Sequence, residues 1–334
     1  MGKTDIKSLP LEQLEQWAVE HGEKKFRAKQ LYQWMHVKLV DDPEQMSNLS
    51  AAFRQKIREN CTFTVLKQVT MQESALDGTR KYLFELEDHN MVESVLMRYK
   101  HGNSVCISSQ VGCRMGCRFC ASTLDGLVRN LTPAEMLEQI YRISADTGER
   151  VSNVVVMGTG EPLDNYDNLL TFIRMLTDEN GLHISQRNLT VSTCGLVPRI
   201  RDLAKEGLQI TLALSLHASN QEKRLELMPV AKSYDIHEAV DAMQDYFEET
   251  GRRVTFEYSL VAGVNDTEED ARELAELIHG INCHVNLIPV NPIKEFKNLL
   301  EKSGINVTIR REMGRDIDGA CGQLRKRFSE RQDS

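Results

Sequence analysis

The sequence has no hydrophobic run long enough to cross a membrane. A spanning helix needs about 20 consecutive apolar residues, whereas the longest apolar runs here, such as residues 154–157, are far shorter. Residues 1–10 also lack the basic-then-apolar pattern of a signal peptide. These absences exclude a membrane-spanning protein and predict a cytoplasmic one without a membrane partner.

A disulfide framework is not expected either. The chain has 8 cysteines, and thiols stay reduced in the cytoplasm. They are therefore interpreted as metal ligands, catalytic thiols or core residues, and any disulfide would be transient and catalytic. Cys61, Cys194 and Cys283 are expected to be packing residues.

An excess of positive charge is also missing. The formal net charge is -8, which argues against a protein that coats nucleic acid non-specifically, because such binding depends on neutralising phosphates. Basic residues nevertheless cluster near both ends, where they form either solvated helix faces or focused contacts. The clusters are Lys24, Lys25, Arg27 and Lys29 near the start, and Arg310, Arg311, Arg315, Arg325, Lys326 and Arg327 near the end.

What the chain does contain is a run of three cysteines, Cys113, Cys117 and Cys120. A structural zinc site or an electron-transfer cluster takes four protein ligands, so an iron–sulfur cluster in this loop would keep one iron open to a small molecule. Three cysteines with an aromatic residue, Phe119, just before the last one resemble the cluster-binding motif of the radical S-adenosylmethionine (SAM) superfamily. Two alternatives stay open: a zinc site with Cys106 as its fourth ligand, and buried thiols without a metal.

The 334 residues allow two or three domains. Apolar residues recur at helical spacing between residues 10 and 60, which predicts a small helical accessory domain at residues 1–78. Residues 81–86 and 91–96 alternate as strands do and predict a linking β-hairpin at residues 79–103. Residues 104–334 are the third predicted unit, a barrel domain that ends in a C-terminal segment.

From residue 104 onward, expected strands and helices alternate. The predicted strand–helix units are 105–108 with 133–145, 153–157 with 166–176, 189–193 with 199–206, 209–216 with 235–249, 254–261 with 268–278, and 284–289 with 296–302. Six such units predict an α/β fold with a parallel sheet, either open and doubly wound or a partial barrel. In both folds the active site lies beyond the carboxyl ends of the strands.

Small polar clusters follow four of these strands. They are Met157-Gly-Thr-Gly-Glu-Pro-Leu, Ser192-Thr-Cys-Gly, Ser215-Leu-His and Pro289-Val-Asn-Pro. Glycines let the backbone approach a ligand, and a carboxylate such as Glu161 can accept a hydrogen bond from an ammonium group. Clusters at successive strand ends would line a single pocket.

The chain resembles the RlmN branch of the RlmN/Cfr family over nearly its whole length. The residues that carry the resemblance are Gln110-Val-Gly-Cys, Gly158-Thr-Gly-Glu-Pro-Leu, Ser215-Leu-His-Ala, Met228-Pro-Val, Gly263-Val-Asn-Asp and Asp316-Ile-Asp-Gly-Ala-Cys-Gly-Gln-Leu. The resemblance implies a partial (β/α)6 radical SAM barrel and an RNA-binding role for the helical domain. It also implies methylation of carbon 2 of an adenosine in 23S rRNA and of the adenosine beside the anticodon in tRNA.

The resemblance further implies the cofactors and their ligands. One 4Fe-4S cluster would be held by Cys113, Cys117 and Cys120. SAM would contact Gly160, Glu161, Ser192, Ser215, Leu216, His217 and Asn291. An external electron donor such as a flavodoxin or ferredoxin is expected, and the protein is expected to be a monomer.

Adenine carbon 2 lies between two ring nitrogens and is electron-poor, so it cannot attack a sulfonium methyl group directly. By resemblance, Cys321 takes a methyl group from one SAM, and a second SAM provides the radical that activates it for addition to carbon 2. Glu93 would accept the proton from carbon 2, and Cys106 would attack Cys321 to release the product as a disulfide forms. From its residues alone, Glu93 is an outward residue of an alternating strand.

Other interpretations remain. A Cfr-like carbon-8 methyltransferase would use the same thiols, and a radical SAM enzyme acting on a non-RNA substrate would not need the paired Cys106 and Cys321. A metal-binding RNA module without enzymatic activity would bind zinc. Met157 is expected in the core, although the resemblance puts a methionine here near the reaction centre. The stretch between Asn291 and Phe296 is about a dozen residues shorter than the family pattern, and such loops often carry function.

Overall fold

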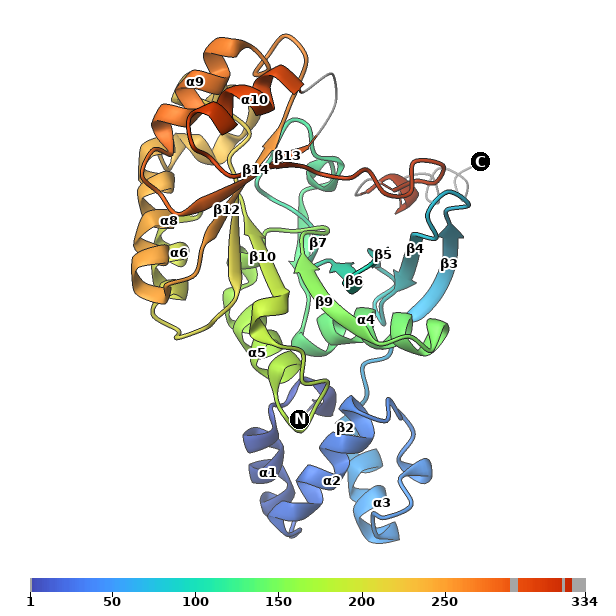
Figure 1. The fold of residues 1–334 in the computed structure, drawn as a ribbon. Helices are drawn as coiled ribbons and strands as arrows, with labels where there is room; N and C mark the ends of the chain where they lie inside the picture. Colours follow the sequence, from blue (N-terminus) through green and yellow to red (C-terminus); the bar gives the residue numbers. More distant parts are fainter. Residues whose placement is uncertain (1, 289–293, 320–321, 326–334) are drawn as a thin grey trace.

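The computed structural model describes residues 2–288, 294–319 and 322–325. The first helices of the chain form a lobe, drawn at the bottom of Figure 1. They are α1 (Leu11–Glu20), α2 (Lys25–His36) and α3 (Ala51–Asn60), and the short strands β1 (Thr4–Asp5) and β2 (Cys61–Thr62) pair in parallel beside them. The helical periodicity predicted for residues 10–60 is confirmed.

A ten-stranded mixed sheet forms the centre of the described structure, in the order β14-β13-β12-β11-β10-β9-β6-β5-β4-β3. Neighbouring strands run parallel from β6 to β14 and antiparallel from β3 to β6. The strands are β3 (Lys67–Glu73), β4 (Arg80–Glu85), β5 (Met91–Tyr99), β6 (Gly102–Ile107), β9 (Val151–Val156), β10 (Leu189–Thr193), β11 (Thr211–Ser215), β12 (Val254–Ser259), β13 (Cys283–Ile288) and β14 (Val307–Ile309). The predicted hairpin is formed by β4 and β5.

Helices cover the outer face of the parallel half of the sheet (Figure 1). They are α4 (Pro133–Thr147), α5 (Tyr166–Thr177), α6 (Val197–Ala204), α8 (Ile236–Thr250), α9 (Glu268–Leu277) and α10 (Lys294–Lys302). The short helix α7 (Gln221–Leu227) is instead hydrogen-bonded to Arg118 in the loop of the three cysteines. The ends of α4 follow from its sequence. Thr132 and Glu135 form a capping box, Pro133 begins the helix, and Gly148 ends it in the left-handed conformation.

All six predicted strand–helix units are present, with bounds that differ by a few residues. Sequence reasoning missed β14 because two of its three residues are exposed, which leaves no apolar run. It also missed α7, whose only buried residue is an arginine rather than an apolar side chain. The pattern thus predicted the elements that bury an apolar face, and missed those that do not.

A buried ion-pair network joins the helical lobe to the barrel. The Lys7 ammonium, 1% exposed, pairs with Glu138 on α4 and lies 2.7 Å from Asp41. Glu138 also accepts a hydrogen bond from Arg142 at 2.8 Å. Because buried charges are stable only when they are paired and hydrogen-bonded, these contacts fix the lobe against α4.

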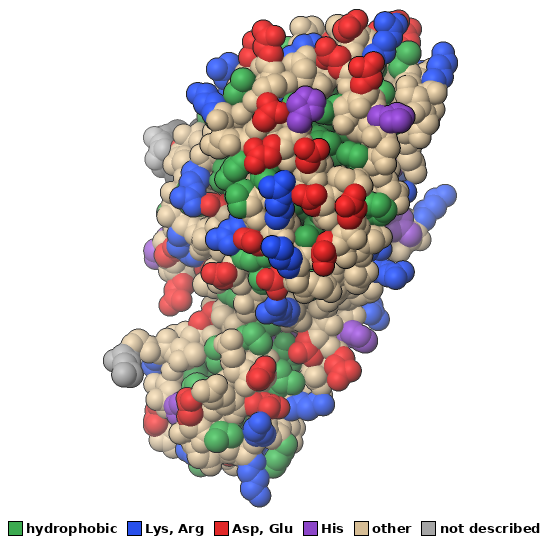
Figure 2. Space-filling model, turned by 90° about the vertical axis from the view of Figure 1, so that its left-hand side faces the viewer, with side chains coloured by type: hydrophobic (Ala, Val, Ile, Leu, Met, Phe, Trp, Pro, Cys, Tyr) green, Lys and Arg blue, Asp and Glu red, His purple; other side chains and the backbone are tan. Residues whose placement is uncertain are grey.

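The outer helical layer, seen face-on in Figure 2, carries acidic and basic side chains side by side. Arg201 pairs with Asp245 at 3.0 Å, and Arg272 pairs with Glu268 at 3.2 Å. A surface of mixed sign does not attract a polyanion, so this face is not a candidate binding surface for nucleic acid. None of the helices in the described parts of the chain is long and apolar enough to cross a bilayer.

Candidate active site

Two short strands close the base of the cysteine loop. β7 (Gln110–Gly112) pairs antiparallel with β8 (Leu127–Asn130). Just inside this pair, the backbone N–H of Cys113 donates to the carbonyl oxygen of Gly126 at 2.8 Å. The cysteines therefore lie in a closed loop between β7 and β8, a few residues beyond the end of β6, where the sequence predicted a loop.

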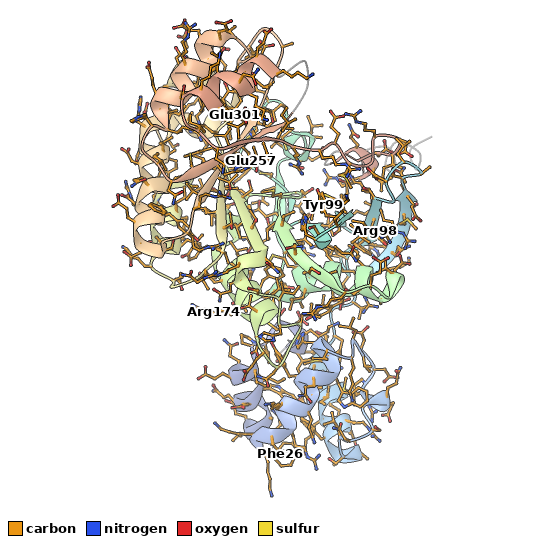
Figure 3. All side chains as sticks on the ribbon, viewed as in Figure 1. Phe26, Arg98, Tyr99, Arg174, Glu257 and Glu301 are labelled. Carbon is orange, nitrogen blue, oxygen red and sulfur yellow. The ribbon has the colours of Figure 1, made fainter. Side chains whose placement is uncertain are left out.

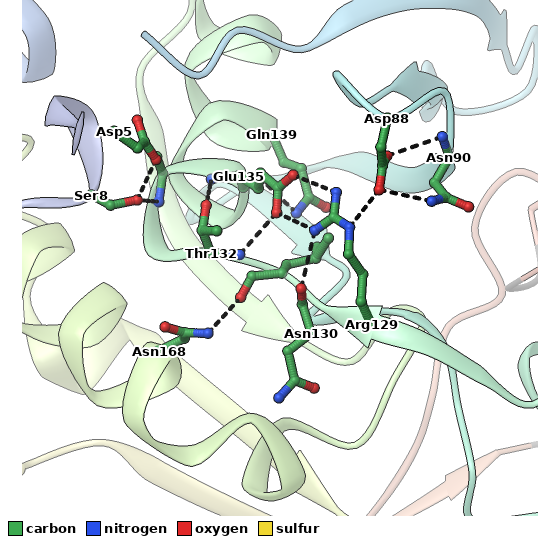
Figure 4. Close-up of polar contacts among 12 residues, drawn as sticks. Asp5, Ser8, Asp88, Asn90, Arg129, Asn130, Thr132, Glu135, Gln139 and Asn168 are labelled. Carbon is green, nitrogen blue, oxygen red and sulfur yellow. Dashed lines mark hydrogen bonds and ion pairs between the residues drawn. The ribbon is translucent and has the colours of Figure 1, made fainter. Parts of the chain in front are cut away.

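One guanidinium fixes the exit of this loop (Figure 4). Arg129 on β8 donates to both carboxylate oxygens of Glu135 at 2.7 and 2.8 Å, and to Asp88 at 2.6 Å. Glu135 belongs to the first turn of α4, and Asp88 to the turn between β4 and β5. A bidentate Arg–carboxylate contact restricts geometry strongly, so the loop is held against two separate elements.

A cavity of about 270 Å³ gathers most of the predicted site residues beside this loop. It lies where the carboxyl ends of the parallel strands meet, which is the place that the fold predicts for a site. The predicted residues that line it are Cys113, Cys117, Cys120, Gly160, Glu161, Ser192, Ser215 and His217. Leu216 is fully buried in the core rather than lining the cavity, and Asn291 lies outside the described residues.

Glu161 presents a buried carboxylate to the cavity. Its two oxygens accept hydrogen bonds from the backbone N–H groups of Leu163 at 3.0 Å and Cys194 at 2.7 Å. Burial raises the pKa of this carboxyl, although the hydrogen bonds oppose the rise. Each oxygen has a further lone pair, so the carboxylate can accept from an ammonium group. Gly160 precedes it at φ of 112°, and a Cβ there would lie 2.6 Å from the Cβ of Gln110, so only glycine fits.

His217 contributes a neutral imidazole. Its Nδ1 accepts a hydrogen bond from the backbone N–H of Ser259 at 3.0 Å, so the ring proton is on Nε2. Burial lowers the pKa of His217 to about 3, which keeps the ring uncharged at neutral pH. The backbone φ of 52°, unusual for this residue type, is maintained by Asn265, whose amide donates to the carbonyl oxygens of His217 and Ser259 at 2.8 Å. Phe119 meets the ring edge-on at 5.0 Å between centroids.

Two hydroxyls complete the predicted set. Ser192 on β10 and Ser215 on β11 lie in paired strands, and their Oγ atoms are 3.3 Å apart. Their side chains are partly exposed, so both oxygens remain open to a polar ligand in the cavity.

Sequence reasoning missed Glu257 on β12, which also lines the cavity. Figure 3 places it in the interior of the barrel. Its side chain is 5% exposed and accepts hydrogen bonds from Asn286 at 2.9 and 3.2 Å. Burial raises the pKa of Glu257, while nearby Arg310 acts in the opposite direction. The available signal was a carboxylate between two aromatic residues of a predicted strand, Phe256 and Tyr258, because a buried charge requires a partner.

A second cavity, of about 340 Å³, adjoins the first. Met157, Ile288 and Arg310 line both cavities, so Met157 is not simply a core residue. Cys106 and Gly319 line the second cavity and not the first.

The position of Cys106 argues against the alternative of a zinc site with Cys106 as its fourth ligand. In the described ranges, no three His, Cys, Asp or Glu side chains are arranged to hold a single metal ion. In an iron–sulfur cluster each cysteine thiolate binds a different iron, so the three thiolates need not converge on a single metal ion. Cys106 is apart from the cavity of the three cysteines, which counts against its being a fourth ligand.

Glu93 is buried, with 5% of its surface exposed, so its interpretation as an outward residue is wrong. One carboxylate oxygen accepts from the backbone N–H of Gly322 at 2.6 Å, and the other from the backbone N–H of Arg325 at 2.7 Å. The Lys81 ammonium, fully buried, lies 2.9 Å from the same carboxylate. Glu93 therefore joins the antiparallel strands to the C-terminal segment.

Glu93 and Cys106 share one face of the sheet. Val95 lies two residues after Glu93 on β5, and it is directly opposite Cys106 on β6. Residues two apart on a strand, and residues directly opposite on paired strands, point to the same face. Lys81 on β4 is opposite Val95 and belongs to this face as well.

The C-terminal segment is fastened to β3 and to the turn that follows it. Ser74 donates to Asp316 at 2.5 Å, and the side chain of Gln72 exchanges hydrogen bonds with Asp318 at 2.9 and 3.0 Å. Cys321 lies outside the described residues, but the described residues on either side of it are the ones that meet Glu93 and the second cavity. Figure 1 shows this segment crossing from β14 towards β3 and β4.

The thiols of the cysteine loop would have to lose their protons to bind a metal. Burial raises the pKa of Cys113 to about 11 and that of Cys117 to about 12, and binding to iron releases such protons.

Cys61 and Cys283 pack in the core, as predicted. Cys194 does not only pack, because it lines the first cavity and its N–H binds Glu161.

Comparisons with known proteins agree with this geometry. The family model for the radical SAM superfamily matches residues 107–278, and that for the ribosomal RNA large subunit methyltransferase N-terminal domain matches residues 4–63. A probable dual-specificity RNA methyltransferase RlmN of Lachnospira eligens is 64% identical, with 98% of this chain and 97% of that protein covered. The chain belongs to the RlmN family. A second RlmN, of Lachnoclostridium phytofermentans, is 60% identical over 98% of this chain and 96% of its own length.

A solved structure extends the RlmN match to the fold. The crystal structure of a radical SAM methyltransferase from Sphaerobacter thermophilus is similar with a TM-score of 0.90 and 41% identity, covering 96% of this chain and 98% of that one. The family resemblance and the α/β radical SAM fold are thereby confirmed. The division at residues 78 and 103 stays a prediction.

Proposed function

We propose that this protein is a radical SAM methyltransferase that methylates carbon 2 of an adenosine in 23S rRNA and of the adenosine beside the anticodon in tRNA. The observation that carries the proposal is the pair of adjoining cavities. One contains three cysteines and a set of SAM-suited groups, and the other contains Cys106 beside the segment that carries Cys321. The relatives at 64% and 60% identity are named dual-specificity RNA methyltransferases.

In this proposal, Cys113, Cys117 and Cys120 hold a 4Fe-4S cluster, and SAM binds in the cavity beside it. When bound, the reduced cluster and SAM supply radical chemistry. Glu161 accepts the SAM ammonium, and Ser192, Ser215 and the Nε2–H of His217 provide further polar contacts. Leu216 can contribute only through its backbone, since its side chain is fully buried, and Asn291 is retained from the resemblance.

Cys321 is the proposed methyl carrier, and Cys106 is the proposed resolving thiol. Release of the product breaks the carbon–sulfur bond at Cys321 and joins the two sulfurs in a transient disulfide, which an external reductant must reopen.

Glu93 is the proposed acceptor of the carbon-2 proton. Its carboxylate shares a sheet face with Cys106 and binds the backbone next to Cys321, so base and thiols would converge on one adenine. Lys81 and the two backbone N–H groups keep the carboxylate in place. A carboxylate held in this way is positioned for general-base catalysis.

The proposed RNA entrance lies at the second cavity. Arg310 and Arg311 line it, and Arg315 lines a surface depression next to it. Guanidinium groups bind phosphates in a bidentate manner, so these residues would position the RNA backbone while the cavity receives one base. We further propose a cytoplasmic monomer that receives electrons from a flavodoxin or ferredoxin.

The deciding experiment incubates the anaerobically reconstituted protein with SAM, a reductant, and either 23S rRNA fragments or tRNA. Digested nucleosides are then analysed by mass and chromatographic retention. We expect a mass gain of one methyl group at the retention of 2-methyladenosine from both RNAs. Retention of 8-methyladenosine would assign the Cfr-like activity instead, and unmodified adenosine in the presence of SAM cleavage would favour a non-RNA substrate. A Cys321→Ala variant serves as the control that cleaves SAM without methylating RNA.

A further inference from the structure

Arg224 on α7 is the largest of the fully buried side chains. Its Nη2 donates to the carbonyl oxygen of Cys194 at 2.7 Å, but its Nε and Nη1 have no hydrogen-bond partner among the described residues. Buried polar groups are nearly always hydrogen-bonded, and leaving a charged donor unsatisfied is especially unfavourable. Two guanidinium nitrogens without a hydrogen-bond partner among the described residues therefore indicate a missing partner.

The charge of Arg224 also has no direct partner, although Asp235 acts on it electrostatically without forming an ion pair. Within the parts of the chain that the structure describes, no carboxylate forms an ion pair with it, whereas the preceding Lys223 pairs with Asp270 at 2.5 Å. A guanidinium does not lose its proton in a protein, and an isolated buried charge is strongly unfavourable. The missing partner must therefore be an anion.

The position of Arg224 shows where that anion belongs. Cys194, whose carbonyl it binds, lines the first cavity together with Cys117. Burial raises the pKa of the Cys117 thiol, and the nearby Arg224 guanidinium acts in the opposite direction. The end of α7 is bonded to the cysteine loop, because the backbone N–H of Arg118 donates to the carbonyl of Leu227 at 3.0 Å.

The chain also leaves room for this side chain. A Cβ at Gly195 would lie 3.0 Å from Nη2 of Arg224, and Gly195 has φ of 104°, a conformation that favours glycine. The glycine of the Ser192-Thr-Cys-Gly motif thus admits a guanidinium between β10 and α7.

We propose that Arg224 supplies the countercharge and the N–H donors for an iron–sulfur cluster held by Cys113, Cys117 and Cys120. The inference rests on the proposed cluster. Thiolate-bound clusters are anionic, and hydrogen bonds to their sulfurs and nearby charge set their reduction potential. Because the cluster gains a negative charge when it accepts an electron, a buried cation stabilises the reduced form more than the oxidised form.

The test compares the full-length protein with Arg224→Gln and Arg224→Lys after anaerobic reconstitution with iron and sulfide. The fraction of reduced cluster is followed by electron paramagnetic resonance during a redox titration without SAM. At a fixed potential, Arg224→Gln should lower the ratio of reduced to oxidised cluster about tenfold, which is about 59 mV for a one-electron couple. Arg224→Lys should stay close to the wild type because it keeps the charge.

Arg118→Gln is the matched control. It removes the same charge one residue from Cys117, but its side chain is exposed and water screens it, so the ratio should change less than about twofold. Failure of the wild type to take up a four-iron cluster would refute the proposed function itself. A wild-type ratio in Arg224→Gln, or an equal shift in Arg224→Lys, would overturn only the role of Arg224.

Thermal unfolding decides the case in which Arg224→Gln does not hold a cluster. In the iron-free protein the guanidinium has no ion-pair partner among the described residues, so the iron-free variant should unfold at or above the wild-type temperature. A marked loss of stability in the iron-free variant would mean that Arg224 is needed for packing alone, and the proposal would be wrong.

Discussion

The contact between Glu93 and Lys81 permits a prediction that separates structural support from catalysis. Both side chains are buried, at 5% and 0% exposure, with 2.9 Å between carboxylate and ammonium. Removing one partner of such a pair leaves the other charge buried and costs about 3–5 kcal/mol. Glu93→Gln and Lys81→Met should each destabilise the protein by about that amount.

The double variant should behave differently. Replacing both partners by neutral groups removes the charge penalty. The remaining loss of stability is about 1–3 kcal/mol. It arises because the single amide oxygen that Glu93→Gln introduces can accept from only one of the two backbone N–H groups that bind the carboxylate. The double variant should therefore be more stable than either single variant. The two single losses sum to about 6–10 kcal/mol, so the two changes should be coupled by at least about 3 kcal/mol.

Urea unfolding of the four proteins measures the coupling, and nucleoside analysis measures methylation. We expect the double variant to regain stability and iron, yet to leave RNA unmethylated, because the proposed base is gone. Additive destabilisation would refute the ion-pair argument. Normal methylation by the double variant would refute the role of Glu93 as the base.

Three further outcomes can be checked separately. Cys113→Ala should abolish iron uptake and reductive SAM cleavage, while Cys283→Ala, a change at a core thiol, should preserve both; full SAM cleavage by the first variant would contradict a cluster at this loop. Cys106→Ala should stall with RNA covalently attached through Cys321, visible as a nuclease-sensitive band shift under denaturing conditions, whereas Cys321→Ala should form no adduct; normal turnover by the first variant would exclude the resolving thiol. Burial lowers the pKa of His36 to about 3, so between pH 6.5 and that value only the unfolded chain binds its proton, and His36 alone should contribute a fall in stability of about 1.4 kcal/mol for each pH unit that the pH is lowered. His36→Gln should reduce that slope by the same amount, and an unchanged slope in urea unfolding would show that His36 does not titrate as stated.

The sequence predicted the fold where apolar spacing carried the information. The strand–helix units from β6 to α10 bury continuous apolar faces, and periodicity detected all of them. Apolar periodicity did not detect α7, because its buried residue is Arg224. Pattern reasoning assumes that burial requires an apolar side chain, and this helix breaks the assumption.

The site was predictable where residues adjacent in sequence also act together. The cysteine loop and the turns after β9, β10 and β11 each carry their own signal, and the fold brings them to one edge. Glu257 and the partners of Glu93 could not be predicted in this way. Their surroundings are set by contacts between residues that are distant along the chain, such as Glu93 with Gly322, and no local spacing encodes those contacts.

The way the C-terminal segment closes on the antiparallel strands has a consequence for biosynthesis. Glu93 and Ser74 precede their partners Gly322, Arg325 and Asp316 by more than 200 residues, so the ribosome adds these partners much later. Domains fold as the chain emerges, amino-terminal part first, so the strands and the cysteine loop can form well before their final partners exist. Such a nascent chain would contain the proposed cluster ligands but lack both the proposed methyl carrier, Cys321, and the backbone groups that bind Glu93. On the proposed mechanism, methyl transfer stays switched off until these partners have been synthesised, and chains that terminate before them should be inert towards RNA.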